Sequence, residues 1–306
     1  MQKKKALFLI FLTAIISGIS IFINKYSVSK IEPYTFTFLK NLLVTIFLIS
    51  IILLSKEYKA LSKLNRKQWL CLLIIGLIGG SIPFLLFFKG LSIASAASSG
   101  FIHKTLFIFA SLFALLLLKE KLSTKILFPT ILLLIGNYLI LRINNFSFGK
   151  GELLILIATV LWAIENVFSK YTLKKISGNI VAFGRMFFGS IFILIFLLFN
   201  QQLHLLNQLT KNDFIWIILS SILLLLFVIT YYNGLKFVKV SVATSILLLG
   251  SPITTFLSYL FSDYQITLSE IIGSLFIISG LILTIKVIEL SEMKVKSSPP
   301  HIHNEL

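Results

Sequence analysis

The chemistry-bearing residues of this chain are few, and the most distinctive pair lies inside a long apolar run. His103 and Lys104 stand side by side in "SSGFIHKTLFIF", and Lys104 is the only charged residue between Lys89 and Lys119. A charge near the middle of a membrane helix costs about 2.5–3.5 kcal/mol on insertion scales, so such a residue faces a cavity or a partner. We therefore predict that Lys104 contacts an anionic group of a substrate. His103 is predicted to donate a hydrogen bond to the substrate or to relay a proton. The alternatives are a Lys104–carboxylate pair between helices and a His103 hydrogen bond to a neighbouring helix.

Glu165, in "LWAIENVFSK", is the only carboxylate well inside an apolar run. Two roles are open for it. It pairs with a buried cation, Lys104 or Arg185, or it exchanges protons and couples their movement to transport. Of the further polar side chains within apolar runs, some are expected to line the same cavity and others to form hydrogen bonds between helices. The substrate-binding candidates among them are Asn137, Tyr232 and Asn233.

The overall composition indicates a membrane protein. Of 306 residues, 57% are hydrophobic and 13% are charged, whereas soluble domains carry about 25% charged residues. The net charge of +17 does not indicate nucleic-acid binding, because the cations fall mostly in short gaps between apolar runs. The expected surroundings are therefore a lipid bilayer.

Several chemistries are not supported by the sequence. No G-x-x-x-x-G-K-[ST] loop occurs, so no ATP site of that kind is expected. Two of the four His residues, His301 and His303, lie in the polar tail, and no metal site can be built from the rest. The single cysteine, Cys71, excludes an intramolecular disulfide. We expect no enzyme activity and no cofactor.

Dividing the chain at its polar and turn-forming stretches gives ten segments of about the 20 residues that cross a bilayer. They lie near 6–25, 34–54, 69–88, 93–118, 125–142, 152–171, 180–200, 213–235, 241–261 and 268–288. The predicted fold is therefore an all-α membrane protein with short connections. Residues 291–306 are polar and are predicted to form a disordered tail.

Lysine and arginine predict the orientation of these spans. Most of them lie in the connections that share a side with the N-terminus, such as "KEYKALSKLNRK" at 56–67. Cytoplasmic connections carry the excess of Lys and Arg. Both termini are therefore expected in the cytoplasm, with the chain crossing the plasma (inner) membrane many times.

The chain contains an internal repeat. "FINKYSVSKIEPYTFTFLKNLL" at 22–43 aligns with "VFSKYTLKKISGNIVAFGRMFF" at 167–188, and "FFKGL" at 87–91 aligns with "YYNGL" at 231–235. The predicted repeats are 1–146 and 147–290, with five spans each. Because five is odd, the second repeat enters the membrane upside down relative to the first, an arrangement typical of secondary transporters.

Lys40 and Arg185 occupy equivalent positions of this repeat. Since the repeats are inverted, Lys40 is expected toward the outside and Arg185 toward the inside. They are predicted to act as matching gates that close one side in turn, or else as anchors at the membrane interface.

Proline and glycine are expected to shape the spans. Pro83, Pro129 and Pro252 predict kinks in the third, fifth and ninth spans, which free backbone carbonyls. Gly76 and Gly80 form a small-xxx-small face that predicts close helix packing.

These patterns resemble the drug/metabolite transporter superfamily, and specifically its EamA-type members, over about residues 5–290. The resemblance rests on the five-plus-five plan, on the early cation in "FTFLKNLL" and "VAFGRMFF", and on small residues opening the fourth spans in "SIASAASSG" and "VKVSVATS". It rests also on "LLLKEKLS" at 116–123, which is similar to the family signature Leu-x-Glu-x-Leu-[Ser/Thr]. Gly136 and Gly280 in the last span of each half complete it. In the second half the acidic residue is displaced to Asp263.

The resemblance and the buried charges together predict a secondary transporter. Export is the expected direction, because the resemblance implies it as the commoner direction among relatives. Its expected substrate is a small organic metabolite, anionic or zwitterionic such as an amino acid, moved by alternating access with protons as a candidate coupling ion. One alternative is a proton-coupled exporter of hydrophobic or cationic compounds that uses Glu165. Another is a membrane scaffold or enzyme subunit. A homodimer is left open.

Overall fold

The computed structural model describes residues 2–27, 31–91, 93–94, 96–120, 124–141, 148–261 and 265–297. For residues 25–27, 96–97, 124 and 288–297 it describes the backbone alone. Asp263, His301 and His303 therefore lie outside the described residues.

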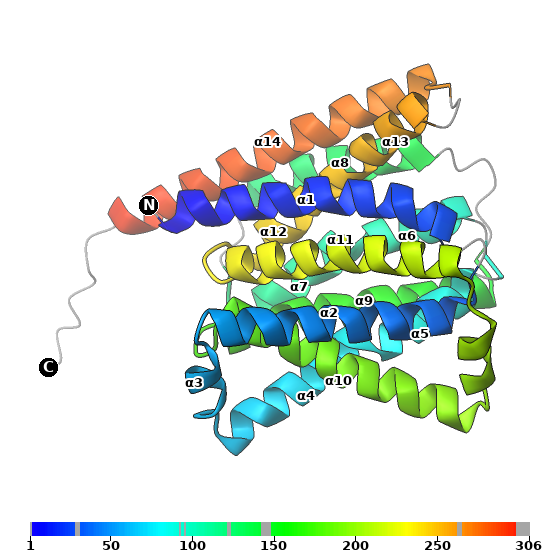
Figure 1. Ribbon diagram of the computed structural model, residues 1–306. Helices are drawn as coiled ribbons and strands as arrows, with labels where there is room; N and C mark the ends of the chain where they lie inside the picture. Colours follow the sequence, from blue (N-terminus) through cyan, green and yellow to red (C-terminus); the bar gives the residue numbers. More distant parts are fainter. Residues whose placement is uncertain are drawn as a thin grey trace, which may run out of the picture.

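All ten predicted spans are helical (Figure 1). They are α1 (Gln2–Ser27), α2 (Pro33–Leu54), α4 (Arg66–Gly80) with α5 (Ile82–Leu91), α6 (Ala96–Lys104) with α7 (Leu106–Leu118), α8 (Leu127–Leu141), α9 (Lys150–Thr172), α10 (Gly178–Phe199), α11 (Lys211–Leu235), α12 (Val240–Ile246) with the 3₁₀ turn η3 (Leu247–Leu249) and α13 (Gly250–Phe261), and α14 (Leu268–Ser297). Within the described ranges, nine of the spans are long and apolar enough to cross a bilayer, and α8 is a shorter apolar helix. The predicted all-α membrane fold is confirmed.

Short elements occupy the connections. They are α3 (Tyr58–Leu61), η1 (Thr124–Ile126) and η2 (Leu203–Gln208). Side chains cap the first turns of several of the spanning helices. The Glu32 carboxylate accepts hydrogen bonds from the backbone N–H groups of Tyr34 and Thr35, with Pro33 in the first turn of α2. Thr210 and Asp213 form a reciprocal capping box at the start of α11. Such caps satisfy the free N–H groups of a first helical turn.

Two spans of the first half are broken in the middle. The third breaks at Ser81, whose φ and ψ are −135° and −76°, as Pro83 predicts. The fourth breaks at Thr105, one residue after Lys104, although no proline is present there. The ninth changes to η3 at Leu247–Leu249, just before Pro252, as expected. Pro129 lies in the first turn of α8, directly after η1, where a helix tolerates a missing N–H because that group has no partner within the helix.

The two halves interlock. The first helix of each half packs against the third and fourth spans of the other half. Thus α1 lies against α11 and α13, whereas α9 lies against α4, α5 and α7 (Figure 1). The last helices, α8 and α14, pair with each other. This reciprocal packing is the arrangement that two inverted repeats produce around a shared centre.

Glycines set the closest helix contacts. A Cβ added to Gly80 would lie 2.3 Å from the Arg185 carbonyl oxygen on α10, and one added to Gly76 would lie 2.3 Å from Phe188 Cβ. The predicted small-residue face of the third span is confirmed, because any larger residue would push α4 away from α10. Between α8 and α14, a Cβ on Gly136 would lie 2.6 Å from the Gly273 carbonyl oxygen.

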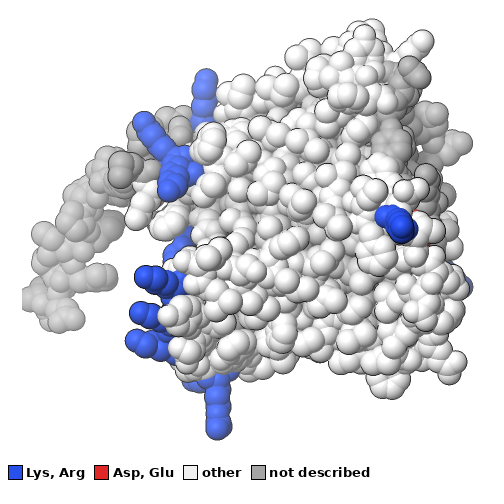
Figure 2. All heavy atoms as spheres, in the orientation of Figure 1, with Lys and Arg blue, Asp and Glu red and all other residues white. Residues whose placement is uncertain are grey.

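Positive charge gathers at one end of the bundle. Figure 2 shows Lys and Arg side chains along the end that carries the N-terminus. We call it the basic end, defined by Gln2, the connection 55–65 and the connection 236–239. The exposed cations in the connection 55–65 and in the first turn of α4 are Lys56, Lys59, Lys63, Arg66 and Lys67. This distribution is the one that cytoplasmic ends of membrane proteins carry.

One boundary differs from the sequence-based expectation. The polar composition predicts a tail from about residue 291, but α14 continues to Ser297. The segment "SEMKVKS" contains Glu, Met and Lys, which favour helix and extend the last span beyond its apolar part. Residues 298–306 lie outside the described part of the chain.

Candidate functional site

The break in the third span presents a backbone carbonyl to the neighbouring helices. Proline has no backbone N–H, so Pro83 cannot bond the carbonyl four residues earlier, which belongs to Gly79. Two side chains donate to that oxygen instead. The Trp162 indole N–H lies 3.1 Å away and Arg185 Nη2 also lies 3.1 Å away. The next carbonyl, of Gly80, accepts a hydrogen bond from Asn41 Nδ2 at 3.0 Å.

A chain of hydrogen bonds leads from this carbonyl to the buried carboxylate. Arg185 Nη1 donates to the Tyr232 hydroxyl at 3.1 Å, and that hydroxyl donates to Glu165 Oε1 at 2.7 Å. Ser169 donates to the same carboxylate oxygen at 2.5 Å. Arg185 is 8% exposed and Glu165 1%, so both charges are removed from solvent. We call Gly79, Trp162, Glu165, Arg185 and Tyr232 the buried network.

From the sequence, Glu165 had two candidate cation partners, namely Lys104 and Arg185. The structure joins it to Arg185 through one hydroxyl group, that of Tyr232. Buried charges need partners of this kind, because each unpaired one costs several kcal/mol. Among the residues that the structure describes, the arginine Nε is buried without a hydrogen-bond partner, so one donor of the buried network is not used there.

A second chain supports the first. The Tyr231 hydroxyl donates to Asn166 Oδ1, and Asn166 Nδ2 donates to the Trp162 carbonyl at 2.7 Å. The end of α11 is therefore attached to α9 at two neighbouring tyrosines. Trp162 is positioned both by its own backbone contact and by the indole bond to Gly79.

An aromatic wall lies beside the network. We define it as Phe84, Phe87, His103 and Trp162. The His103 ring centroid lies 5.0 Å from that of Trp162 and 5.3 Å from that of Phe87, and Phe84 meets Trp162 at 5.2 Å. These separations are those of favourable edge and offset contacts. His103 Nδ1 is buried and has no hydrogen-bond partner within the described part of the chain.

Two further cations belong to residues beside the aromatic wall: Lys40, which contacts Phe84, and Lys104, which follows His103 in the chain. Lys40 is 6% exposed, and its Nζ lies 4.9 Å from the Phe36 ring centroid and 5.9 Å from that of Phe84. In the part of the chain that the structure describes, this ammonium has no hydrogen-bond or ion-pair partner. Lys104 ends α6 and is partly buried, and within the same described ranges its ammonium likewise has none.

The other candidates lie apart from the buried network. Asn137 is fully buried on α8, and its Nδ2 reaches the Phe101 carbonyl at 3.5 Å. Asn233 points toward the start of α10, where its Nδ2 donates to Asn179 Oδ1 at 2.9 Å. It also lines a surface hollow of about 390 Å³ at the basic end. The structure thus brings together His103, Glu165, Arg185 and Tyr232, with Lys40 reaching the same aromatic wall.

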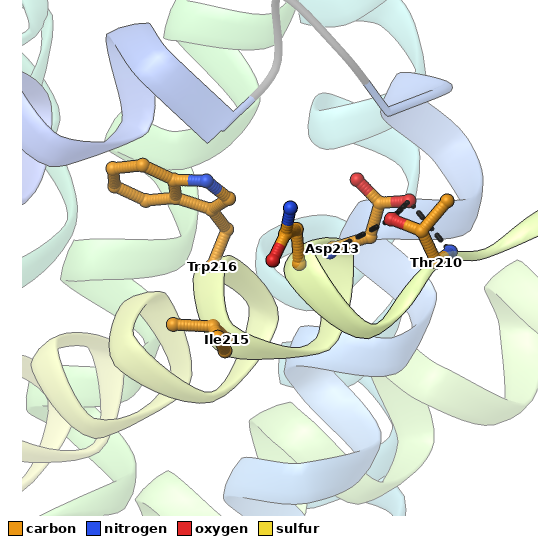
Figure 3. A pocket seen from close by; sticks show the side chains of 5 residues that line it. Thr210, Asp213, Ile215 and Trp216 are labelled. Atoms are coloured by element: carbon orange, nitrogen blue, oxygen red, sulfur yellow. Dashed lines mark hydrogen bonds between the residues drawn. The ribbon is translucent and has the colours of Figure 1, made fainter.

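Another surface hollow, of about 370 Å³, lies at the start of α11 (Figure 3). It is lined by Thr210, Asn212, Asp213, Ile215 and Trp216. The side chains of Thr210 and Asp213 in it are engaged in capping α11. None of the candidate residues lines it.

Sequence reasoning missed Trp162 and the Gly79 carbonyl. A signal for the carbonyl was present, because a proline at 83 frees the oxygen of residue 79 by the helical spacing. No comparable signal identified Trp162, since an aromatic residue in a membrane span is ordinary. Only the packing of α9 against α4 and α5 shows its bond to Gly79.

The comparisons with known proteins agree with this architecture. The model of the EamA-like transporter family matches residues 4–142 and again 149–286. An uncharacterized transporter from Clostridium kluyveri is 26% identical over 298 residues, covering 92% of this chain and 93% of its own. The riboflavin transporter ImpX of Fusobacterium nucleatum is 27% identical over 274 residues, covering 82% and 86%.

A solved crystal structure superposes on the chain with a TM-score of 0.78 at 16% sequence identity. The match covers 92% of this chain and 97% of the other. At this identity the likeness extends to the fold alone.

Proposed function

The chain belongs to the EamA-like transporter family, and we propose that it is a secondary transporter of a small organic anion or zwitterion. Its two halves, 1–146 and 147–290, would alternate access to a shared site. The proposed direction is export, because export is the commoner direction among relatives. The energy for it comes from a proton or substrate gradient. The basic end faces the cytoplasm, in keeping with its Lys and Arg content (Figure 2).

The observation that carries this proposal is the excess of positive charge inside the spans. Three cations, Lys40, Lys104 and Arg185, lie within the spans. Of these, Arg185 is joined through Tyr232 to Glu165, whose oxygen also accepts a hydrogen bond from Ser169. The ammonium of Lys40 is buried against two aromatic rings with no anion beside it in the described part of the chain. Since an unpaired buried charge is costly, a substrate anion would relieve that cost on binding.

The aromatic wall supplies the apolar part of such a site. Phe84, which lies under the Lys40 ammonium, also contacts Trp162. A carboxylate near Lys40 would therefore place the rest of the substrate along Trp162 and His103. Riboflavin is a reasonable test compound, because one relative carries its name and a planar ring system can stack on such a wall.

The rival in which Glu165 binds cationic drugs is less well supported. Glu165 is 1% exposed and accepts two hydrogen bonds, so its carboxylate is occupied. The small multidrug relatives carry a carboxylate in their first span, whereas α1 carries none. A scaffold or enzyme subunit would require no buried cation excess.

Flux from proteoliposomes tests the proposal. Vesicles are loaded with a metabolite library that includes amino acids, other carboxylates, riboflavin and cationic dyes, and release is followed by mass spectrometry. We expect selective release of one anionic or zwitterionic class by the wild type. Lys40→Met and Lys104→Ala should each reduce it at least tenfold, whereas Lys175→Gln, an exposed lysine at the basic end, should not.

Two results would contradict the proposal. One is release of cationic dyes with unchanged flux in both lysine variants. The other is retention of every compound by the wild type when vesicles of the same batch contain folded protein.

A further inference from the structure

The connection between α11 and α12, residues 236–239, is held from both sides by charged side chains that the proposed function does not use. Lys170 Nζ donates to three carbonyls at the end of α11 and beyond it, those of Leu235 at 2.7 Å, Lys236 at 3.0 Å and Val238 at 2.8 Å. Glu120 accepts from the backbone N–H of Val240 at 2.8 Å and from the Ser241 hydroxyl at 2.9 Å. We call Glu120, Lys170 and residues 236–239 the latch.

Each charge has the sign that its helix end favours. The C-terminal carbonyls of a helix attract a cation and the N-terminal N–H groups attract an anion. Lys170 meets the former and Glu120 the latter, so the short connection is stabilised at both ends. Hydrogen bonds to charged groups of this kind are about twice as strong as neutral ones.

The latch joins the two halves of the chain. Glu120 follows α7 and belongs to the first half, whereas Lys170 on α9 and the connection itself belong to the second. Glu120 is also the acidic residue of "LLLKEKLS", which the sequence singled out without a role. Its carboxylate supplies the only side-chain cap for α12 within the described residues, because Lys239 in the N-cap position gives none.

The latch lies at a closed end of the molecule. All seven residues of α12 are buried, and so are Leu235, directly before the connection, and Val238 within it. One turn before Leu235, Tyr232 bonds Glu165, and Glu165 lies on α9 five residues before Lys170. The same helix therefore holds the end of α11 through the buried network and through the latch.

We propose that Glu120 and Lys170 hold the basic end closed and must release the α11–α12 connection when the transporter opens there. This goes beyond the proposed function, because it names the contacts that break in one step of the cycle. In alternating access one end opens while the other stays shut. A charged contact between the halves suits such a step, since it can be broken without unpacking the apolar core.

Cysteine labelling tests the latch without any substrate. In a Cys71→Ser background, Ser245→Cys places a reporter on α12 at a position that is 4% exposed. Ala158→Cys, fully buried on α9, reports general loosening. N-ethylmaleimide modification of the full-length protein in lipid nanodiscs is followed by intact mass.

Glu120→Ala and Lys170→Met should raise the labelling rate at Ser245→Cys at least tenfold and leave the Ala158→Cys rate unchanged. Glu120→Gln keeps an acceptor but loses the charge and should give an intermediate rise. Lys170→Arg keeps donors for the carbonyls, so its labelling rate at Ser245→Cys should stay low, unlike that of Lys170→Met. The exposed neighbours Lys119→Gln and Lys175→Gln serve as controls and should change neither rate.

Equal labelling of the latch variants and the controls would overturn the proposal. A parallel rise at both reporters would overturn it as well, because it would show that Glu120 and Lys170 only stabilise the fold. Neither result would bear on whether the protein transports an anion, since no substrate enters the measurement.

Discussion

Lys40 on α2 and Arg185 on α10 occupy equivalent positions of the internal repeat, but their surroundings differ. Arg185 donates to the Gly79 carbonyl and to Tyr232, and through Tyr232 it reaches a carboxylate. Lys40 meets two phenyl rings and, among the described residues, no anion. Both reach the broken third span, Arg185 at Gly79 before the break and Lys40 at Phe84 after it. One cation is therefore built into the framework and the other is left available.

The difference follows from a few exchanges between the halves. The second half carries Glu165 and Tyr232 where the aligned residues of the first half are Ser20 and Phe88. The first half carries Pro83 and a broken third span, whereas α11 is continuous from Lys211 to Leu235. The polar side chains of the buried network therefore lie on α9, α10 and α11. The Gly79 carbonyl that accepts from them lies on α4.

Burial separates the halves in the same way. In the fourth span of the first half, 98–118, 22% of the most apolar window is buried, but in its counterpart, 240–261, 56% is. All seven residues of α12 are buried, whereas the exposed residues of the first-half span, Leu112, Leu115, Leu116 and Leu117, lie on α7.

The largest effect should separate the two equivalent cations. Arg185→Met leaves Glu165 without its cation and removes one donor from the Gly79 carbonyl, so the free energy of unfolding should fall by about 3–5 kcal/mol. Lys40→Met removes a buried charge that has no ion-pair partner in the described ranges, and it should leave the free energy of unfolding unchanged or slightly higher. Both are measured by SDS titration of the purified protein in mixed micelles. Equal losses for the two variants would refute the distinction.

The next effect concerns the close approach of the third span to α9. A Cβ on Gly79 would lie 2.4 Å from Glu165 Cγ, so Gly79→Ala should cost about 1–3 kcal/mol by overpacking. Gly250→Ala is the matched control, because its Cβ would have no neighbour closer than 3.4 Å. The same titration compares them, and a cost at Gly250 as large as at Gly79 would argue against a tight contact at the network.

Glu165→Gln tests whether the carboxylate of the buried network only stabilises the fold or also couples protons to transport. Glutamine keeps an acceptor for Tyr232 and Ser169 but loses the charge, so the bonds weaken from the charged to the neutral range, a loss of about 1 kcal/mol each. If Glu165 serves the framework alone, substrate release keeps its dependence on pH. A release rate that no longer responds to pH would instead assign proton coupling to Glu165. Proteoliposome flux at acid and alkaline pH distinguishes the two.

The smallest effect tests the freed carbonyl through a double-mutant cycle. Pro83→Ala returns an N–H that can bond the Gly79 oxygen and make the third span more like α11. Arg185→Met should then cost less in this background, with a coupling of about 1 kcal/mol. Strictly additive unfolding free energies would mean that Pro83 does not control the carbonyl that Arg185 uses.

How much of this fold is predictable depends on the kind of feature. The ten spans, the repeat and the packing of Gly76 and Gly80 are readable from the sequence, because a bilayer demands long apolar helices and small residues where they meet. The break at Thr105 is not, since no proline or glycine marks it. The sequence also places the end of α14 too early, because polar helix formers resemble a tail.

The candidate site is predictable in part, and for a physical reason. Buried charges are costly enough to stand out in a sequence, so His103, Glu165 and Arg185 are recognisable as candidates from their apolar surroundings alone. Their partners are not, because the hydrogen bonds of the buried network join residues 47 to 106 positions apart, which meet only where the helices cross. The sequence therefore identified which charges require a partner, whereas helix packing decided that Arg185 and Glu165 have one and that Lys40, among the described residues, does not.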